Sequence, residues 1–341
     1  MKRYIDALAI AVENACGPLP WRPIKNPDVC RPQAYAMTML GRLAVLGGDL
    51  RECEIARLAA DEGFSVRLYD APAAAAAAGV TTTSSAEEAL RDADVILLPI
   101  PHMTGDVVFA PHASAPIVLT EKLLGLARHG AVLITGAFPA GLRERASRAG
   151  IVVHEYGEQE GLKRMRGPLI AEAALKALDE QGLGPKPGST AVVVGIGAIG
   201  GPLVRMLAAR GVKVRAAARD PATIPTDLGP MLAGAIRFAE LRYAVADIAL
   251  LIATTAGRAV GSDVLVAVPA AATIADVASP PGSFDYGDRQ DLATRVRWLR
   301  GLGGRQPQRI GAAQWQVIRG HLAACGIPLR HQEEEQSAGT R

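Results

Sequence analysis

Hydrophobic and polar positions alternate along the chain between short apolar runs and longer amphipathic stretches, and glycine stands at many of the junctions. The clearest example begins at residues 190–194, a β-branched run that leads into Gly-x-Gly-x-x-Gly and then into a helical pattern as far as Arg210. Residues 212–217 add a second apolar run. This strand–glycine–helix–strand order is typical of a dinucleotide-binding unit.

A second unit of similar pattern precedes it. Residues 43–46 predict a strand, a helical pattern runs through Ala60, and residues 64–69 predict the next strand. Further strands are expected at residues 94–99, 131–135, 151–154, 247–253, 273–277 and 295–299, and helices at 161–178 and 308–323. This alternation predicts the α/β class, with two Rossmann-like doubly wound parallel-sheet domains.

Breaks in the pattern divide the chain into segments. Prolines recur between residues 18 and 32, where they prevent a helix or a paired strand, and an alanine-rich stretch at residues 71–85 predicts a loose connection. The expected segments are a poorly structured extension at 1–38, a substrate domain at 39–155, a connecting helix and linker at 156–188, a cofactor domain at 189–304, a C-terminal helix at 305–330 and a disordered tail at 331–341.

Each glycine of the loop after residue 194 has a physical role. Gly195 permits the tight turn, Gly197 lets backbone N–H groups reach a diphosphate, and Gly200 lets helix and strand pack closely. The N-terminus of the following helix adds unpaired N–H groups and a partial positive charge. We therefore expect Gly195, Gly197, Ala198, Ile199 and Gly200 to bind a cofactor; the alternative is a tight turn without a ligand.

The end of the next strand bears on which dinucleotide is bound. An NAD site usually has an acidic residue about 20 residues beyond the glycines, where it binds the ribose 2′-hydroxyl. Here the strand ends on Arg219, and Asp220 is displaced into the following turn. A guanidinium binds the additional phosphate of NADP, which a carboxylate repels, so NADP is preferred over NAD. The alternative is a solvated surface arginine.

Two later strand ends add to the expected cofactor site. Thr254 and Thr255 follow the strand at 247–253, beside the expected position of the nicotinamide ribose, and Ser279 follows the strand at 273–277. Because α/β folds bind ligands at the carboxyl ends of their parallel strands, Thr254 and Ser279 are cofactor-binding candidates.

The glycine turn of the first unit differs from that of the second. Gly48, Asp49 and Arg51 follow the strand, but Glu52 occupies the region where a third glycine is needed for close backbone approach. We therefore prefer a smaller ligand here over a second nucleotide. Gly48, Asp49 and Arg51 are substrate-binding candidates, with Arg51 on a substrate carboxylate; an ordinary exposed helix arginine is the alternative.

Composition narrows the function classes. The formal net charge of +3 and the scattered arginines do not indicate a nucleic-acid surface. The 4 cysteines form no Cys-x-x-Cys pair, which favours reduced thiols in the cytoplasm over a disulfide framework or a metal site. No apolar run approaches the roughly 20 residues that a membrane span requires, and a signal peptide is not expected.

Four stretches together resemble one known family, the A subunit of dipicolinate synthase. They are residues 46–51, residues 118–121 with 130–136, the Gly195 loop with Arg219, and residues 276–282 with 301–304. The likeness extends from Met39 to about Ala323. Gly303 stands where family members tend to have proline, and the element from Pro168 to Glu172 is one residue longer than in the family.

This resemblance implies a two-domain architecture related to D-2-hydroxyacid dehydrogenases, with the final helix returning to the N-terminal domain. It also implies an NADP-dependent oxidation of a dihydrodipicolinate-type ring to pyridine-2,6-dicarboxylate. The partner that it implies is a flavoprotein-like B subunit, in a homo- or hetero-oligomer. Another cyclic imine or 2-hydroxy acid substrate, or a non-catalytic NADP-binding module, remains an alternative.

Aromatising such a ring requires a hydride acceptor and a group that takes a proton. His102, Glu172 and Asp276 are the candidate bases, although Asp276 can equally cap the turn after its strand. Arg305 joins Arg51 as a candidate partner for the substrate carboxylates. No histidine lies between His154 and His321, so the Arg/Glu/His set of the D-2-hydroxyacid dehydrogenases is not apparent.

Overall fold

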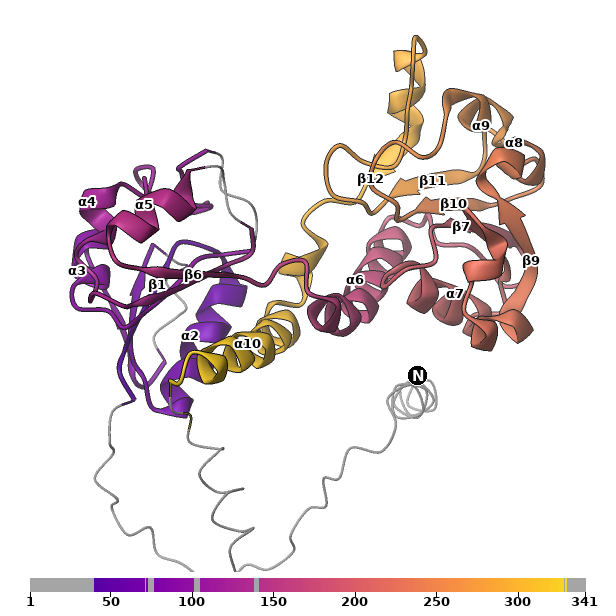
Figure 1. Ribbon diagram of the computed structural model, residues 1–341. Coiled ribbons are helices and arrows are strands. Elements are labelled where there is room, and N and C mark those ends of the chain that lie inside the picture. Colours follow the sequence, from indigo (N-terminus) through magenta and orange to yellow (C-terminus); the bar gives the residue numbers. More distant parts are fainter. Residues whose placement is uncertain are drawn as a thin grey trace, which may run out of the picture. The chain divides into compact units, whose positions relative to one another are not determined.

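The structure, a computed structural model, describes residues 40–70, 72, 77–100, 105–137, 141–327 and 329. Two six-stranded sheets carry the fold (Figure 1). The predicted extension at residues 1–38 and the predicted tail at 331–341 lie outside the described residues.

The first sheet has the order β3-β2-β1-β4-β5-β6, and all its neighbouring strands are parallel. Its strands are β1 (Arg42–Leu46), β2 (Ser65–Tyr69), β3 (Val80–Thr82), β4 (Val95–Leu97), β5 (Val132–Thr135) and β6 (Val152–Glu155), and its helices are α2 (Leu50–Glu62), α3 (Ala86–Leu90), α4 (Glu121–Leu124) and α5 (Leu142–Arg148). The chain moves outward from β1 to β3 and then returns to β4 on the other side of β1, so the sheet is doubly wound.

The second sheet repeats this plan in the order β12-β11-β10-β7-β8-β9, again with parallel neighbours. Its elements are β7 (Thr190–Val194), α7 (Gly200–Ala209), β8 (Lys213–Ala218), β9 (Leu232–Arg237), α8 (Leu241–Ala244), β10 (Leu250–Ala253), α9 (Ser262–Ala267), β11 (Thr273–Asp276) and β12 (Val296–Trp298). Short 3-10 turns connect them at Pro221–Thr223, Thr226–Met231, Phe238–Glu240, Gln290–Arg295 and Leu302–Arg305. The two doubly wound parallel sheets confirm the predicted fold class.

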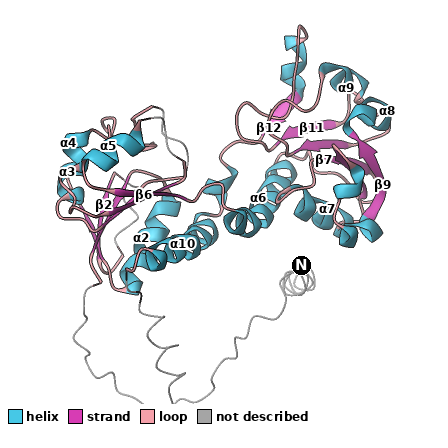
Figure 2. Cartoon of the chain, in the orientation of Figure 1, coloured by secondary structure: helices cyan, strands magenta, loops and turns pink. Residues whose placement is uncertain are grey.

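Buried apolar side chains cover both faces of the second sheet. On one face, the apolar core includes side chains of α6 (Glu160–Glu180) and α7. On the other face, it includes side chains of α8 and α9 (Figure 2). Strands that are buried on both faces consist of continuous apolar runs, as β7 and β10 do. Such strands have no polar face, so polar side chains gather at their carboxyl ends, where the cavity described below lies.

The last helix, α10 (Pro307–Ala324), packs on α2 of the first sheet. Trp315 and Ile318 of α10 join the apolar core that contains Ile55, and the Trp315 ring meets Phe64 edge-on at a centroid distance of 6.4 Å. The C-terminal helix therefore contacts the part of the chain that contains the first sheet, with α10 beside α2 (Figure 1).

Two edge strands and one helix cap show where local pattern succeeds and fails. Thr120 caps α4 as its residue type predicts, with its side chain accepting a hydrogen bond from the Leu123 amide at 3.1 Å. The alanine-rich connection at residues 71–85 is a partial error, because Val80–Thr82 forms β3 against β2. The edge strand β9 was also not predicted. Edge strands lack the apolar run of a buried strand.

Candidate functional site

A cavity of about 710 Å³ lies at the carboxyl ends of the strands in the second sheet. Gly195, Arg219, Thr254 and Ser279, which follow β7, β8, β10 and β11, all line it. The sheet reverses its strand order between β7 and β10, and this reversal is where doubly wound folds bind their ligands. The structure therefore brings four of the predicted cofactor residues to one cavity.

The glycine loop forms the floor of this cavity. Gly195 has a φ of +86°, and its amide donates to the Ala217 carbonyl at 2.8 Å, which ties the turn to β8. A Cβ atom on Gly200 would collide with the Gly195 carbonyl, whereas one on Gly197 would meet nothing within 4 Å. Close packing at Gly200 and open space at Gly197 are the two properties that a diphosphate-binding loop requires.

The N-terminus of α7 is open toward the cavity. Ile199 stands at the N-cap position and provides no side-chain hydrogen bond, and Ala198 lines the cavity beside it. A helix start without a side-chain cap leaves amide donors free for an anion, and the helix dipole favours negative charge there.

A further glycine, Gly167 on α6, lines the same cavity and was not among the predicted site residues. A Cβ atom on Gly167 would collide with the Ala198 carbonyl, so only glycine lets α6 approach the loop this closely. The sequence signal was a glycine inside an otherwise regular helical pattern, which often marks a close backbone contact.

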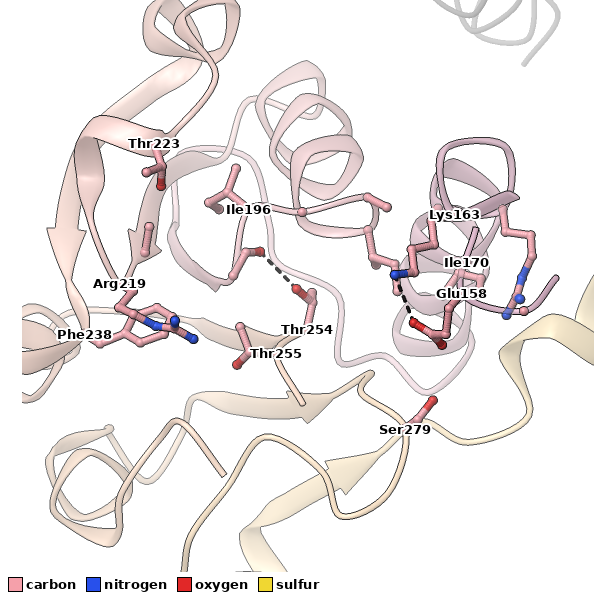
Figure 3. A pocket seen from close by; sticks show the side chains of 18 of the residues that line it. Glu158, Lys163, Ile170, Ile196, Arg219, Thr223, Phe238, Thr254, Thr255 and Ser279 are labelled. Carbon is pink, nitrogen blue, oxygen red and sulfur yellow. Dashed lines mark hydrogen bonds and ion pairs between the residues drawn. The ribbon is translucent and has the colours of Figure 1, made fainter. Parts of the chain in front are cut away.

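Arg219 lies at one end of the cavity beside Phe238 (Figure 3). Its side chain is exposed, and among the described residues no carboxylate pairs with it. Asp220 is held separately, because its carboxylate accepts from the Ala222 amide at 3.2 Å and lies 3.8 Å from an Arg237 nitrogen. The guanidinium at this end is thus available to an anion.

Two threonine hydroxyls differ in their hydrogen bonding. Thr254 donates to the Gly195 carbonyl at 3.0 Å and so braces the turn. The Thr255 hydroxyl lines the cavity, is buried and has no partner among the described residues. A buried polar atom without a partner is costly in a native protein, unless a ligand supplies the bond. The open glycine loop, the free Arg219 and the Thr255 hydroxyl fit a nicotinamide dinucleotide.

The predicted bases do not gather at this cavity. Glu172 pairs with Arg309 of α10 at 2.7 Å, and Arg305 pairs with Glu180 at 2.8 Å; Glu172, Glu180 and Arg305 line a separate, smaller cavity. His102 lies outside the described residues, two positions after Ile100, which lines the larger cavity.

Asp276 is buried at the end of β11 and is held by hydrogen bonds from the loop that follows the strand. Its carboxylate accepts hydrogen bonds from the Ala278 amide at 2.9 Å, the Ser283 amide at 2.8 Å and the Ser283 hydroxyl at 2.8 Å. Three bonds of this kind hold the loop in place. The capping alternative therefore describes what the structure shows for Asp276.

The glycine turn of the first sheet is closed by internal bonds. The Gly48 amide donates to the Phe109 carbonyl at 2.8 Å, and the Asp49 amide donates to Glu52 at 2.8 Å. Arg51 is buried and donates twice to the Asp49 carboxylate, with both distances 2.8 Å. Gly48, Asp49 and Arg51 do not line the cavity, and Arg51 is not the exposed helix arginine of the alternative. Internal hydrogen bonds therefore already occupy these two amide donors of the turn.

The buried carboxyl group of Glu52 leads to a prediction about how the stability of the protein depends on pH. Burial raises the pKa of Glu52 to about 7 against the lowering effect of Arg51, and one carboxylate oxygen has no partner among the described residues. The folded state therefore binds this proton more tightly than the unfolded chain, so the contribution of Glu52 to stability is fully present below pH 4.5 and is lost as the pH rises through 7. We expect Glu52→Gln to remove this loss, which amounts to up to about 3 kcal/mol at pH 8.

Urea titrations of the wild type and of Glu52→Gln at pH 5 and pH 8 measure this difference. The exposed carboxylate of Glu87 on α3 offers a matched control, Glu87→Gln, for which the difference between the two pH values should equal that of the wild type. Equal pH dependence in wild type and Glu52→Gln would contradict the prediction.

Comparison with known proteins finds a family model that resembles the part of the chain containing the first sheet. Residues 42–157 match the family model for the N-terminal domain of the A subunit of dipicolinate synthase. Over 267 residues the chain is 25% identical to the dipicolinate synthase A subunit of Bacillus subtilis (strain 168), covering 77% of this chain and 89% of that relative.

Solved structures extend the likeness to both sheets. The A chain of dipicolinate synthase from Bacillus subtilis has a TM-score of 0.72 at 25% identity, covering 85% of this chain and 98% of that chain. The A subunit from Bacillus halodurans has a TM-score of 0.75 at 23% identity, covering 84% and 99%. At the level of fold alone, D-lactate dehydrogenase from Escherichia coli has a TM-score of 0.51 at 11% identity, covering 82% and 95%.

The resemblance found in the sequence is thereby confirmed. Residues 42–157 match the family model for the N-terminal domain of the dipicolinate synthase A subunit, and the chain is similar to that subunit over most of its length.

Proposed function

We propose that this chain is an NADP-dependent dehydrogenase that oxidises a dihydrodipicolinate-type ring to pyridine-2,6-dicarboxylate. The observation that carries the proposal is the cavity whose floor is an open glycine loop and whose far end holds Arg219, which has no carboxylate partner in the described part of the chain. The relationship to the A subunit of dipicolinate synthase supports the substrate class, since the relative's name states the product of the enzyme.

The cofactor half of the proposal assigns each end of the dinucleotide to residues of this chain. The amides of Gly197, Ala198 and Ile199 would bind the diphosphate, because the start of α7 is uncapped by side chains. Arg219 would pair with the 2′-phosphate, which favours NADP over NAD. The Thr255 hydroxyl would bond near the nicotinamide ribose. Bound NADP⁺ supplies the hydride acceptor.

The protein must also take a proton from the carbon next to the one that loses the hydride. Because the product ring is aromatic, a base of moderate strength suffices. Among the predicted bases, Glu172 and Asp276 have structural partners away from the cavity, so we propose His102 for this step. Its neighbour in sequence, Ile100, lines the cavity.

One observation favours a second candidate function. The described lining of the cavity contains no carboxylate–histidine pair of the kind that acid–base catalysis uses. A non-catalytic NADP-binding module that regulates a partner would have this property. The two functions differ in whether the protein itself forms product.

Two assays test the proposal. Titration of the purified protein with NADPH, followed by nucleotide fluorescence, should show saturable binding that is tighter than for NADH. Formation of pyridine-2,6-dicarboxylate from freshly generated dihydro precursor should depend on the protein and on NADP⁺, and should fall with His102→Gln while NADPH binding is unchanged. Binding without turnover under every condition would favour the regulatory module, and absence of binding would exclude both.

We further propose a hetero-oligomer with a flavoprotein-like B subunit, because the related proteins are named as one lettered component of a synthase. Co-expression of such a protein should increase product formation, and the two chains should co-purify. We also propose a cytoplasmic location for this assembly. None of the helices in the described part of the chain combines the length and apolar character that a bilayer span requires.

A further inference from the structure

Arg166 of α6 lines the cavity. Its Nε atom is buried and makes no hydrogen bond, and among the described residues no carboxylate forms an ion pair with it. Glu158, the carboxylate that acts on its charge, pairs instead with Lys163 at 2.9 Å. Figure 3 shows Glu158 and Lys163 directed toward each other at this wall.

An unpaired cation in this position is costly. Burial lowers the pKa of Arg166 below its ordinary value, and the like charge of Arg51 lowers it further. Arg166 is partly buried, its Nε atom fully so, and charges withdrawn from water in native proteins are normally paired. Arg51 itself is neutralised by Asp49, so the Arg166 guanidinium is the charge on this wall that the protein leaves without a counterion among the described residues.

We propose that Arg166 binds a carboxylate of the substrate, an inference that rests on the proposed dehydrogenase function. A guanidinium matches a carboxylate with two parallel N–H bonds, and a planar ring acid held in this way keeps a defined orientation. The same wall contains Gly167, which lies so close to the Ala198 carbonyl of the glycine loop that an added Cβ atom would collide with it. Arg166 directly precedes Gly167 in the helix, so its backbone lies beside the glycine loop. The substrate is thereby anchored beside the cofactor site.

The surroundings of Arg166 favour the substrate over the cofactor as its anion. The groups that act on its charge are Arg51 of α2 and Tyr156 and Glu158 after β6, all from the N-terminal unit. Arg219, the expected phosphate partner, is not among them. A diphosphate on the loop would be bound by amides at the start of α7, which belongs to the other sheet.

The probe is pyridine-2,6-dicarboxylate, titrated by calorimetry into the full-length protein saturated with NADP⁺. Arg166→Met should weaken probe binding about 30-fold or more, the range expected for loss of a bidentate charge-assisted bond. Arg166→Lys keeps the charge and should lose about tenfold. Arg164→Met is the matched control, an exposed arginine of the same helix outside the cavity lining, and should bind the probe as the wild type does.

Two further readouts separate this role from a structural one. NADPH affinity should change less than about twofold in all three variants, and Arg166→Met without ligand should unfold at a temperature equal to or above that of the wild type, because a costly charge has been removed. Wild-type probe affinity in Arg166→Met, or an equal loss of NADPH affinity, would overturn the inference.

Failure of the proposed function has a different signature. If the wild-type protein binds the probe through Arg166 but binds neither NADP⁺ nor NADPH, the carboxylate-binding role of Arg166 is supported and the dehydrogenase function is disproved. If the wild-type protein binds NADPH but not the probe, the carboxylate-binding role of Arg166 is disproved and the proposed cofactor site is unaffected.

Discussion

Gly200→Ala is expected to weaken NADPH binding by about 100-fold or more, comparable to the roughly 100-fold loss of rate that a misplacement of about 1 Å can cause in a catalytic site. The added Cβ atom would collide with the Gly195 carbonyl, which belongs to backbone and cannot move aside as a flexible side chain would. Helix α7 must therefore shift away from β7, and the amide donors at its start move with it. Overpacking of this kind also costs about 1–3 kcal/mol of stability.

The neighbouring glycines provide matched controls. At Gly201 an added Cβ atom would meet Leu228 at 3.8 Å, an ordinary contact, so Gly201→Ala should keep both stability and NADPH affinity. At Gly197 the added atom would meet no protein atom within 4 Å, so Gly197→Ala should keep its thermal midpoint and lose NADPH binding. Fluorescence titration and thermal unfolding of the three variants measure both quantities. Full NADPH affinity in Gly197→Ala would contradict the diphosphate site.

Arg219→Ala is expected to weaken NADPH binding about 50- to 100-fold while NADH affinity stays within about twofold, because charge-assisted bonds contribute about 1.5–3 kcal/mol each. The physical reason is that Arg219 has no carboxylate partner among the described residues and lines the cavity, so its charge is available to the 2′-phosphate. The preference for NADPH over NADH should therefore disappear, and titration with each nucleotide measures it.

A second arginine controls for general charge effects. Arg242 is exposed on α8, stacks on Tyr243 and does not line the cavity. Arg242→Ala removes the same charge from the same sheet unit and should leave both nucleotide affinities unchanged. An equal loss of NADH and NADPH binding in Arg219→Ala would show that this residue does not select the phosphate.

Most of the fold could be predicted from local pattern. The apolar runs of β1, β4, β7 and β10 are continuous because parallel strands are covered on both faces, and each stands out in the sequence. Edge strands were harder to predict from the sequence. β3 at Val80–Thr82 is partly exposed and short, so its pattern does not differ from that of a loop. The contact between α10 and α2 came from family resemblance, since residues far apart in sequence carry no local signal of their pairing.

The residues of the candidate site also differ in how far the sequence predicts their roles. Gly195, Gly197 and Gly200 were predictable because backbone geometry at a tight turn restricts the residue type itself. Asp276 and Glu172 were not, because a carboxylate serves equally as a base, a cap or an ion-pair partner. Their partners, Ser283 and Arg309, are brought to them only by the folded chain.

The amino-acid sequence by itself determined the two doubly wound sheets, the position of the glycine loop and the arginine at the end of β8, since each follows from local periodicity and turn chemistry. Only the tertiary structure decided which charged groups are already paired and which are free. Arg51 is paired with Asp49, whereas Arg166 and Arg219 line the cavity unpaired among the described residues. Burial and hydrogen-bond partners depend on segments that are distant in sequence, so the availability of a side chain for a ligand is a property of the folded chain.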